Sequence, residues 1–129
     1  MADGTAIGQV NLERLREVGS SFHARDVEGI VGCFAENGEF RNATGPDVWG
    51  ERYQGKPAIR AFFQGLFART PDVAWNHTAE FVCGDRAVTE WHRTATLPSG
   101  EKQDWLGCDL YIFRGPLIMR KDTYVKVIR

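Results

Sequence analysis

The sequence contains few of the features that identify several large classes of protein. Its three cysteines, Cys33, Cys83 and Cys108, lie far apart, and none belongs to a Cys-x-x-Cys pair. An odd number at this spacing supports neither a disulfide framework nor a zinc site. The simplest interpretation is three small buried hydrophobic side chains in a reducing compartment. We therefore expect a cytoplasmic protein without a structural metal.

Charge and hydropathy exclude two further kinds of partner. The chain has 16 basic and 17 acidic residues and no run rich in Lys and Arg, so we expect no nucleic-acid partner. No apolar stretch reaches the roughly 18 residues of a membrane span, so we expect no membrane partner. Residues 1–5 lack the charged and apolar regions of a secretory signal. Phosphate loops, G-x-G-x-x-G and serine nucleophile elbows are also missing, which leaves nucleotide binding and acyl-enzyme chemistry unsupported.

The first half of the chain has the periodicity of helices. Apolar residues recur at helical spacing over residues 7–22 and again over 27–34, with Asp26 as the N-cap of the second helix. A third helix is predicted from Pro57, with its buried face running from Ile59 to Phe67. Residues 39–42 predict a brief strand. The loop over residues 43–54 contains the apolar Val48 and Trp49, which suggests a flap over something.

The second half predicts a sheet. Strand-like runs cover residues 73–83, 87–97, 103–113 and 117–128, and short turns of Gly, Pro, Asp and Ser join them. Such spacing is typical of an antiparallel meander. Helices first and long strands last predict an α+β fold in one domain over residues 1–129, with a curved sheet around the helices.

Asp109 is the residue whose surroundings most need an explanation. It is the one carboxylate in the apolar and aromatic run over residues 107–113. An unpaired buried charge is very costly, so this acid must be paired, neutral or in contact with a ligand. In a functional interpretation Asp109 is a general acid or proton shuttle. In the alternative it pairs with Lys121 on the next strand and is structural.

Strand alternation assigns the remaining polar residues to two faces. One face of the second long strand is predicted to carry Val88, Glu90, His92 and Thr94. The other carries Thr89, Trp91, Arg93 and Ala95, and together with Trp75 this outer face is expected to form a homodimer interface. Gln103, Trp105, Gly107, Asp109, Tyr111 and Phe113 share one face of the third long strand.

His92 is the second candidate for acid–base chemistry. Its side chain titrates near neutrality, and Glu90 on the same face could orient it for dehydration or keto–enol chemistry. The alternative is a histidine satisfied within the sheet. Glu90, His92 and Asp109 could supply three metal ligands, but nothing in their spacing requires a metal, so we predict neither metal nor cofactor.

The order of these elements resembles the nuclear transport factor 2-like superfamily. Three segments carry the resemblance: residues 25–38 (RDVEGIVGCFAENG), residues 55–63 (GKPAIRAFF) and residues 107–113 (GCDLYIF), the last followed by residues 118–124. Their order and spacing are similar to the polyketide-cyclase-like, or SnoaL-like, branch. The resemblance implies a cone whose concave sheet encloses a pocket for a small apolar molecule, and often a homodimer. In cyclase-like members a single aspartate acts as acid and base, which implies that role for Asp109.

Two enzyme groups of the superfamily imply further site residues. In ketosteroid isomerase-like members, a tyrosine, a carboxylate base and a protonated aspartate fall on Val18, Asn42 and Asp109, so only the last is kept. Limonene-type epoxide hydrolases place a catalytic Asp-Arg-Asp trio on Glu90, His92 and Thr123. Their Asn and Tyr fall on Asn42 and Phe40. The second comparison also implies that Glu90, His92, Lys121 and Thr123 point into the concave side.

These observations give one leading hypothesis and its rivals. The first is a small enzyme in which Asp109 and His92 carry out cofactor-free proton transfer on a compact apolar or aromatic substrate, giving cyclisation, isomerisation or dehydration. The substrate is expected to contact Val18, Phe40, Asn42, Trp49, Tyr53, Glu90, Trp105, Tyr111 and Lys121. The rivals are a non-catalytic ligand-binding or dimerisation module, and a structural partner with a filled, dry interior.

Overall fold

The computed structural model describes residues 4–129, so residues 1–3 of the segment considered for a secretory signal lie outside it. The helices and strands occur in the predicted order, except that a short additional strand, β2, lies at the end of the predicted loop over residues 43–54. They are α1 (Gly4–His23), α2 (Val27–Gly32), β1 (Phe34–Arg41), β2 (Arg52–Gln54), α3 (Lys56–Arg69), β3 (Ala74–Cys83), β4 (Arg86–Thr96), β5 (Lys102–Arg114) and β6 (Leu117–Val125). None of the described helices combines the length and the apolar character needed to cross a membrane.

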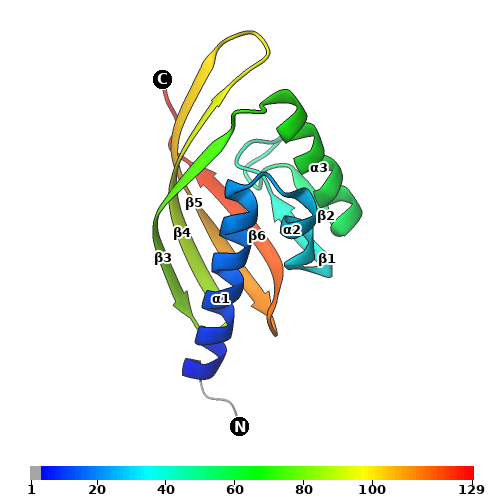
Figure 1. Cartoon of the computed structure of the whole chain (residues 1–129), viewed down its shortest axis with the longest axis vertical. Helices are drawn as coiled ribbons and strands as arrows, with labels where there is room; N and C mark the ends of the chain where they lie inside the picture. Colours follow the sequence, from blue (N-terminus) through cyan, green and yellow to red (C-terminus); the bar gives the residue numbers. More distant parts are fainter. Residues whose placement is uncertain (1–3) are drawn as a thin grey trace.

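The described strands form one six-stranded sheet in the order β2-β1-β6-β5-β4-β3. Strands β3 to β6 are the predicted antiparallel meander. Strand β1 is longer than predicted and lies parallel to β6, which brings the first strand of the chain beside the last. The sheet curves around the helices, as Figure 1 shows, and this confirms the predicted α+β fold with a curved sheet.

Local sequence signals set the ends of the two helices that follow α1. The Asp26 carboxylate accepts a hydrogen bond from the backbone N–H of Gly29, at 3.1 Å, and so caps α2 as predicted. Helix α3 follows Gly55, whose φ of +86° favours glycine, and has Pro57 in its first turn. It ends at Thr70, whose hydroxyl donates to the carbonyl of Leu66 at 2.7 Å. This end of α3 lies at the cavity described below.

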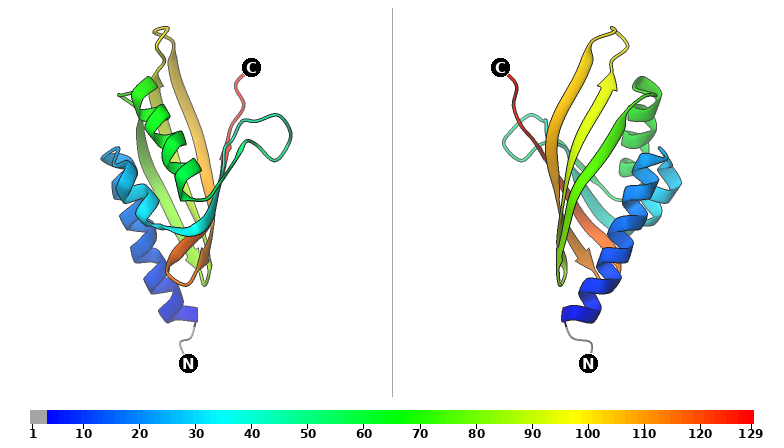
Figure 2. Two further views of the ribbon diagram at one scale, coloured as in Figure 1. Left: turned by 90° about the vertical axis from the view of Figure 1, so that its right-hand side faces the viewer. Right: turned by 60° about the vertical axis from the view of Figure 1, so that its left-hand side comes forward.

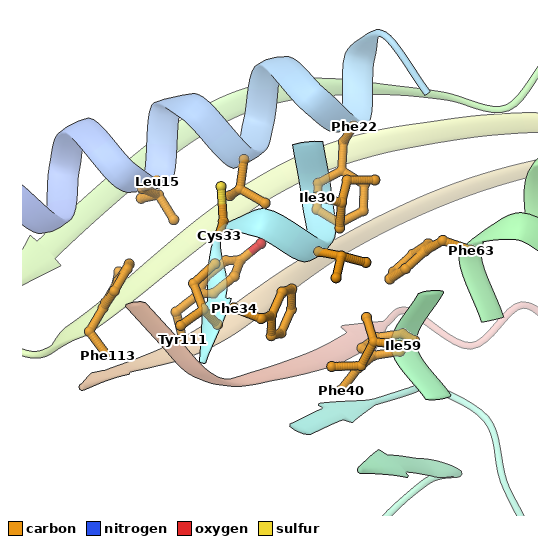
Figure 3. Packing of buried hydrophobic residues seen from close by; sticks show 14 residues of the cluster. Leu15, Phe22, Ile30, Cys33, Phe34, Phe40, Ile59, Phe63, Tyr111 and Phe113 are labelled. Atoms are coloured by element: carbon orange, nitrogen blue, oxygen red, sulfur yellow. The ribbon is translucent and has the colours of Figure 1, made fainter. Parts of the chain in front are cut away.

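The core lies between the helices and the concave face of the sheet. Figure 3 shows side chains from α1, α2, α3, β1 and β5 meeting there. Phe63 is central: its ring centroid lies 5.3 Å from that of Phe22 on α1 and 5.2 Å from that of Phe40 on β1. Such edge and tilted contacts between aromatic rings stabilise beyond their buried area. They hold α3 against the sheet at one end of the core.

The segment between β1 and β2 does not cover the concave side as a flap. Figure 2 shows it extending away from the helices. The side chains of Val48 and Trp49 are 92% and 59% exposed, and only Ala43 and Thr44 at its start reach the cavity. The segment therefore does not lie over the cavity, and Val48 and Trp49 instead line a separate hollow of about 110 Å³ together with residues 122–125.

The prediction of three buried cysteines is correct for one of them. Cys33 is buried, Cys108 is partly buried and Cys83 is exposed at the end of β3. All three thiols are free. Burial raises the pKa of the Cys33 thiol, and it also raises that of Cys108.

Candidate functional site

A cavity of about 210 Å³ lies between α3, the start of the β1–β2 segment and the concave face of β3 to β6. Its volume is below the roughly 300–1,000 Å³ of sites for drug-sized ligands, so it suits a compact molecule. Aromatic and aliphatic side chains form most of its walls, with a few polar groups between them. It is lined by Phe40, Asn42, Ala43, Thr44, Phe62, Phe63, Leu66, Arg69, Thr70, Trp75, Trp91, Arg93, Leu97, Gln103, Trp105, Lys121, Thr123 and Val125.

The predicted assignment of faces on β4 is wrong. Thr89, Trp91 and Arg93 are buried on the concave side, whereas Glu90 is exposed and His92 is partly exposed on the outer side. The Nε2 atom of His92 lies within hydrogen-bond distance of the Asp104 carboxylate of β5 there. Glu90 and His92 therefore do not line the cavity, and the predicted roles of both at a concave site lose their geometric basis.

The same error affects the aromatic residues expected on the outer face. Trp75, Trp91 and Arg93 all line the cavity. Trp75 and Phe81, which simple alternation places together, lie on opposite sides because the register of β3 shifts between His77 and Ala79. A bulge of this kind changes which side chains face the core.

Asp109 is buried and fully hydrogen-bonded. Its side chain is 4% exposed, and its Oδ1 accepts from Lys121 Nζ at 3.0 Å and from Thr123 Oγ1 at 2.6 Å. Its Oδ2 accepts from Trp91 Nε1 at 2.9 Å and from Thr89 Oγ1 at 3.3 Å. A carboxylate has about four acceptor sites, so these contacts use its whole capacity. Asp109 lies behind the cavity wall and is not among the residues that line it.

Lys121 is the group that connects this carboxylate to the cavity. Its ammonium donates to Asp109 and, at 2.9 Å, to Thr123 Oγ1, and it lies 4.6 Å from the centroid of the Phe40 ring. An ammonium has three N–H donors. Within residues 4–129 the third has no hydrogen-bond acceptor. Lys121 lines the cavity, so it can donate a hydrogen bond to a ligand there.

Gly107 makes the contact between Trp91 and Asp109 sterically feasible. It pairs with Trp91 across β4 and β5. A Cβ atom at Gly107 would lie 2.5 Å from the Trp91 ring, which is too close for real atoms. The missing side chain lets the ring lie over β5, where its Nε1 reaches Asp109.

Arg93 is the second buried cation of the site, and it has very different surroundings. It is 5% exposed, and its guanidinium lies 4.4 Å from the ring centroid of Trp105 and 5.8 Å from that of Trp75. Its Nη1 donates to Gln103 Oε1 at 2.9 Å. Burial lowers the pKa of Arg93 to about 10.

The remaining predicted contact residues fall into two groups. Phe40, Asn42 and Trp105 line the cavity, as does Lys121. Val18 and Tyr111 are buried in the core and do not reach the cavity, and burial raises the pKa of the Tyr111 hydroxyl well above its usual range.

The two aromatic residues predicted from the loop region also lie outside the cavity lining. Tyr53 packs against the rings of Phe40 and Phe62, at centroid distances of 5.7 and 4.7 Å. Trp49 lies on the exposed segment, with the Arg52 guanidinium 5.9 Å from its ring centroid. Neither side chain lines the cavity of about 210 Å³, although Trp49 lines the smaller hollow of about 110 Å³.

The described residues do not form a metal centre. No group of three or more His, Cys, Asp or Glu side chains comes together among them. Glu90 and His92 lie on the opposite side of the sheet from Asp109, so the trio that could have supplied three ligands is separated by the sheet itself.

Several lining residues were missed by the sequence reasoning, including Trp75, Trp91, Arg93, Arg69 and Thr70. One signal could have identified part of this set. Gly107 in an otherwise bulky strand indicates that a large side chain crosses that strand. With the β4–β5 turn centred on Ser99, the residue opposite Gly107 is Trp91, which would have placed Trp91 and Arg93 on the concave face.

A curved sheet packed around helices, with a ligand-sized cavity on its concave side, defines a nuclear transport factor 2-like protein. The sequence profile of the SnoaL-like domain matches residues 15–121, and the chain belongs to this family. No curated protein matches the sequence.

Solved structures support the same fold. A candidate polyketide cyclase from Xanthomonas campestris pv. campestris superposes with a TM-score of 0.81 at 17% identity, over 93% of each chain. TerC co-crystallised with polyporic acid gives 0.78 at 19%, over 91% of this chain and 92% of the other. A ketosteroid isomerase-like protein from Catenulispora acidiphila in complex with trimethylamine gives 0.76 at 17%, over 87% and 84%. At these identities the likeness concerns the fold alone.

Proposed function

We propose that this protein binds a compact, flat and largely apolar molecule in the cavity and acts on it by cofactor-free proton transfer. The observation that carries the proposal is the buried pair of Lys121 and Asp109, in which the ammonium reaches the cavity and the carboxylate lies behind it. Such an arrangement presents a fixed positive charge to a ligand in apolar surroundings, where it acts strongly.

The chemistry that fits this geometry is enolisation of a carbonyl compound. The free N–H of Lys121 donates to the carbonyl oxygen and stabilises the negative charge that develops there. Water takes the proton from the neighbouring carbon, and reprotonation at another atom completes an isomerisation, while attack of the enolate on a second carbonyl gives a ring. Asp109 is a positioning residue in this scheme, because its acceptor sites are filled by Lys121, Thr123, Trp91 and Thr89.

The comparisons add support of a limited kind. TerC was crystallised with polyporic acid, and another structure of this fold is a candidate polyketide cyclase. Both names agree with an organic ligand for a protein of this fold. The amine bound by the Catenulispora protein fits this chain less well, because its cavity lining contains no carboxylate.

The test uses phenylpyruvate, an aromatic ketone with an exchangeable C–H group. Proton NMR in deuterium oxide follows exchange at the carbon next to the carbonyl. We expect the protein to accelerate exchange above the buffer rate, and Asp109→Asn to reduce the effect by at least tenfold, because the ammonium loses its charged partner. His92→Ala is the matched control and should exchange at the wild-type rate, since His92 lies on the outer face.

A second variant keeps the test decisive if Asp109→Asn folds poorly. The double variant Asp109→Asn/Lys121→Met removes both charges of the pair, so neither is left buried without its partner. Circular dichroism should therefore show a folded protein, and exchange should fall to the buffer rate. Full exchange activity in either folded variant would contradict the proposed role of the pair.

A non-catalytic binding module is the alternative, and one observation favours it. Asp109 has no free acceptor site, and the cavity lining contains neither histidine nor a carboxylate that could take a proton. In that case phenylpyruvate should bind to the protein, while the hydrogen–deuterium exchange at its carbon next to the carbonyl should stay at the rate measured in buffer. The binding measurement and the exchange measurement together separate the two functions.

A homodimer through the outer face of the sheet belongs to the same proposal. Phe81, Leu106, Leu110 and Tyr124 are 41–60% exposed on that face, beside a hollow of about 360 Å³. Exposed apolar patches of this kind favour a partner surface. Light scattering should show that the wild-type protein is a dimer and that Leu106→Glu is a monomer. The control variant Gln64→Glu, at an exposed position of α3, should remain a dimer. A monomeric wild type would contradict the proposal.

A further inference from the structure

Arg93 is a buried cation without an anion to balance it. In the described part of the chain no carboxylate oxygen lies within ion-pair distance of its guanidinium, and its one hydrogen bond goes to the neutral amide of Gln103. A guanidinium has five N–H donors. Burying such a charge without a partner costs free energy, and nearly all buried Arg side chains are paired.

The unused N–H donors of Arg93 face the cavity. Among the described residues, the single fully buried side-chain polar atom without a partner is Asn11 Oδ1. The free guanidinium nitrogens are therefore not sealed inside protein, although the side chain as a whole is 5% exposed. Since Arg93 lines the cavity, the remaining accessible space is the cavity itself.

The other charges around the cavity strengthen this imbalance. Arg69 and Lys121 line it together with Arg93, and no Asp or Glu does. Asp109 behind the wall balances Lys121, at 3.0 Å. Asp72 contributes to the field at Arg93, but its carboxylate already accepts two hydrogen bonds from Thr96. The cavity therefore has an excess of positive charge.

We propose that Arg93 binds a carboxylate of the ligand, so that the molecule taken up by the cavity is a compact aromatic or conjugated acid. The guanidinium presents its N–H donors in a planar fork that matches a carboxylate. Its contacts with the rings of Trp75 and Trp105 restrict the orientation of this fork. This inference rests on the proposed function for the existence of a ligand in the cavity. It adds the class of ligand and its orientation, with the carboxylate at Arg93 and the reacting oxygen at Lys121.

The rival explanation is that Arg93 only stacks between the two tryptophan rings. Cation–π contacts do stabilise a buried guanidinium. They use the faces of the rings and leave the in-plane N–H donors free, so stacking explains the position of the side chain without satisfying those donors. The two explanations differ in what they predict for a neutral ligand of the same shape.

The experiment compares 2-naphthoate with 2-naphthamide by isothermal titration calorimetry. The two probes have nearly the same shape and differ in charge. We expect the wild-type protein to bind the acid at least tenfold more tightly, because hydrogen bonds between two charged groups are stronger than those to a neutral amide. Arg93→Met should abolish this preference and keep the affinity for the amide.

Arg86→Met is the matched control, because it removes the same charge from the same strand at an exposed position. It should keep the preference for the acid. Equal binding of acid and amide to the wild type overturns the assignment and leaves the proposed function standing. Loss of the preference in Arg86→Met overturns it as well, since overall charge would then be the cause. Binding of neither probe overturns both proposals.

Discussion

Replacing Arg93 by methionine should stabilise the ligand-free protein, whereas the same change at Lys121 should destabilise it. Both side chains are buried cations at one cavity, 5% exposed in each case. They differ in their partners, since Lys121 contacts Asp109 and Arg93 contacts only an amide. Methionine is long, flexible and apolar, so it fills much of the space of either side chain.

The magnitude for Arg93 follows from its pKa. Burial lowers this pKa from the ordinary value of a guanidinium to about 10, and at about 1.36 kcal/mol for each pH unit the charged form costs about 3 kcal/mol. The two tryptophan contacts and the hydrogen bond to Gln103 return about 2 kcal/mol of this. We therefore expect Arg93→Met to raise the free energy of unfolding by about 1 kcal/mol at pH 7.

The dependence on pH has a definite sign. Between pH 10 and 12.5 the unfolded chain binds more protons at Arg93 than the folded one, so this group makes the wild type more stable as pH rises through that window. Below pH 10 both states are charged and the penalty is constant. The difference between Arg93→Met and the wild type should therefore stay the same from pH 6 to pH 9.

The assay is urea unfolding followed by circular dichroism on both variants. Lys121→Met leaves the buried Asp109 carboxylate without its cation, which should cost about 3–5 kcal/mol. A loss of more than about 1 kcal/mol in Arg93→Met would refute the reasoning, because Arg93 would then be a structural cation with no need of a ligand. Equal effects of the two substitutions would refute it too.

Three further predictions concern the surroundings of the site. Gly107→Ala should lower the free energy of unfolding by about 1–3 kcal/mol in urea titrations, because the new Cβ would lie 2.5 Å from the Trp91 ring, and a neutral result would mean that this ring can move. His92→Ala should leave the affinity for 2-naphthoate unchanged in calorimetry, and a tenfold loss would place His92 in the site after all. In the native protein iodoacetamide should label the exposed Cys83 within minutes but Cys33 only after unfolding, because Cys33 is buried and burial raises the pKa of its thiol. Mass spectrometry of the peptides measures the labelling, and equal labelling of the two cysteines would contradict the prediction.

The fold was predictable because its signals are local and repeated. Asp26 and Pro57 mark helix starts that the structure confirms, and short turns separate four strand-like runs. The parallel pairing of β1 with β6 was not predicted. It joins residues about eighty positions apart, and β1 itself contains polar residues that hide most of its length from a pattern of alternation.

The side chains that point to the concave side were predictable on β5 and β6 but not on β4. On β5 the aromatic residues Tyr111 and Phe113 lie on one face, which must therefore be the buried one. Asp109 shares this face by alternation, so the direction of its side chain was predictable. On β4 both faces mix polar and apolar groups, and a shift of one residue exchanges the faces. Glu90 and His92 attracted a functional interpretation because their side chains are common in acid–base catalysis, whereas the charged group on the concave face of β4 is Arg93.

The contacts of Asp109 bear on what an aspartate at this position means in related sequences. One carboxylate on β5 accepts hydrogen bonds from β4 through Thr89 and Trp91, and from β6 through Lys121 and Thr123. It therefore fastens three neighbouring strands at a single point of the curved sheet. A chain that had lost all chemistry would still have a structural use for this acid. An aspartate at this position in another sequence is thus evidence of a shared architecture, and the side chains that reach the cavity are where a difference in activity should be sought.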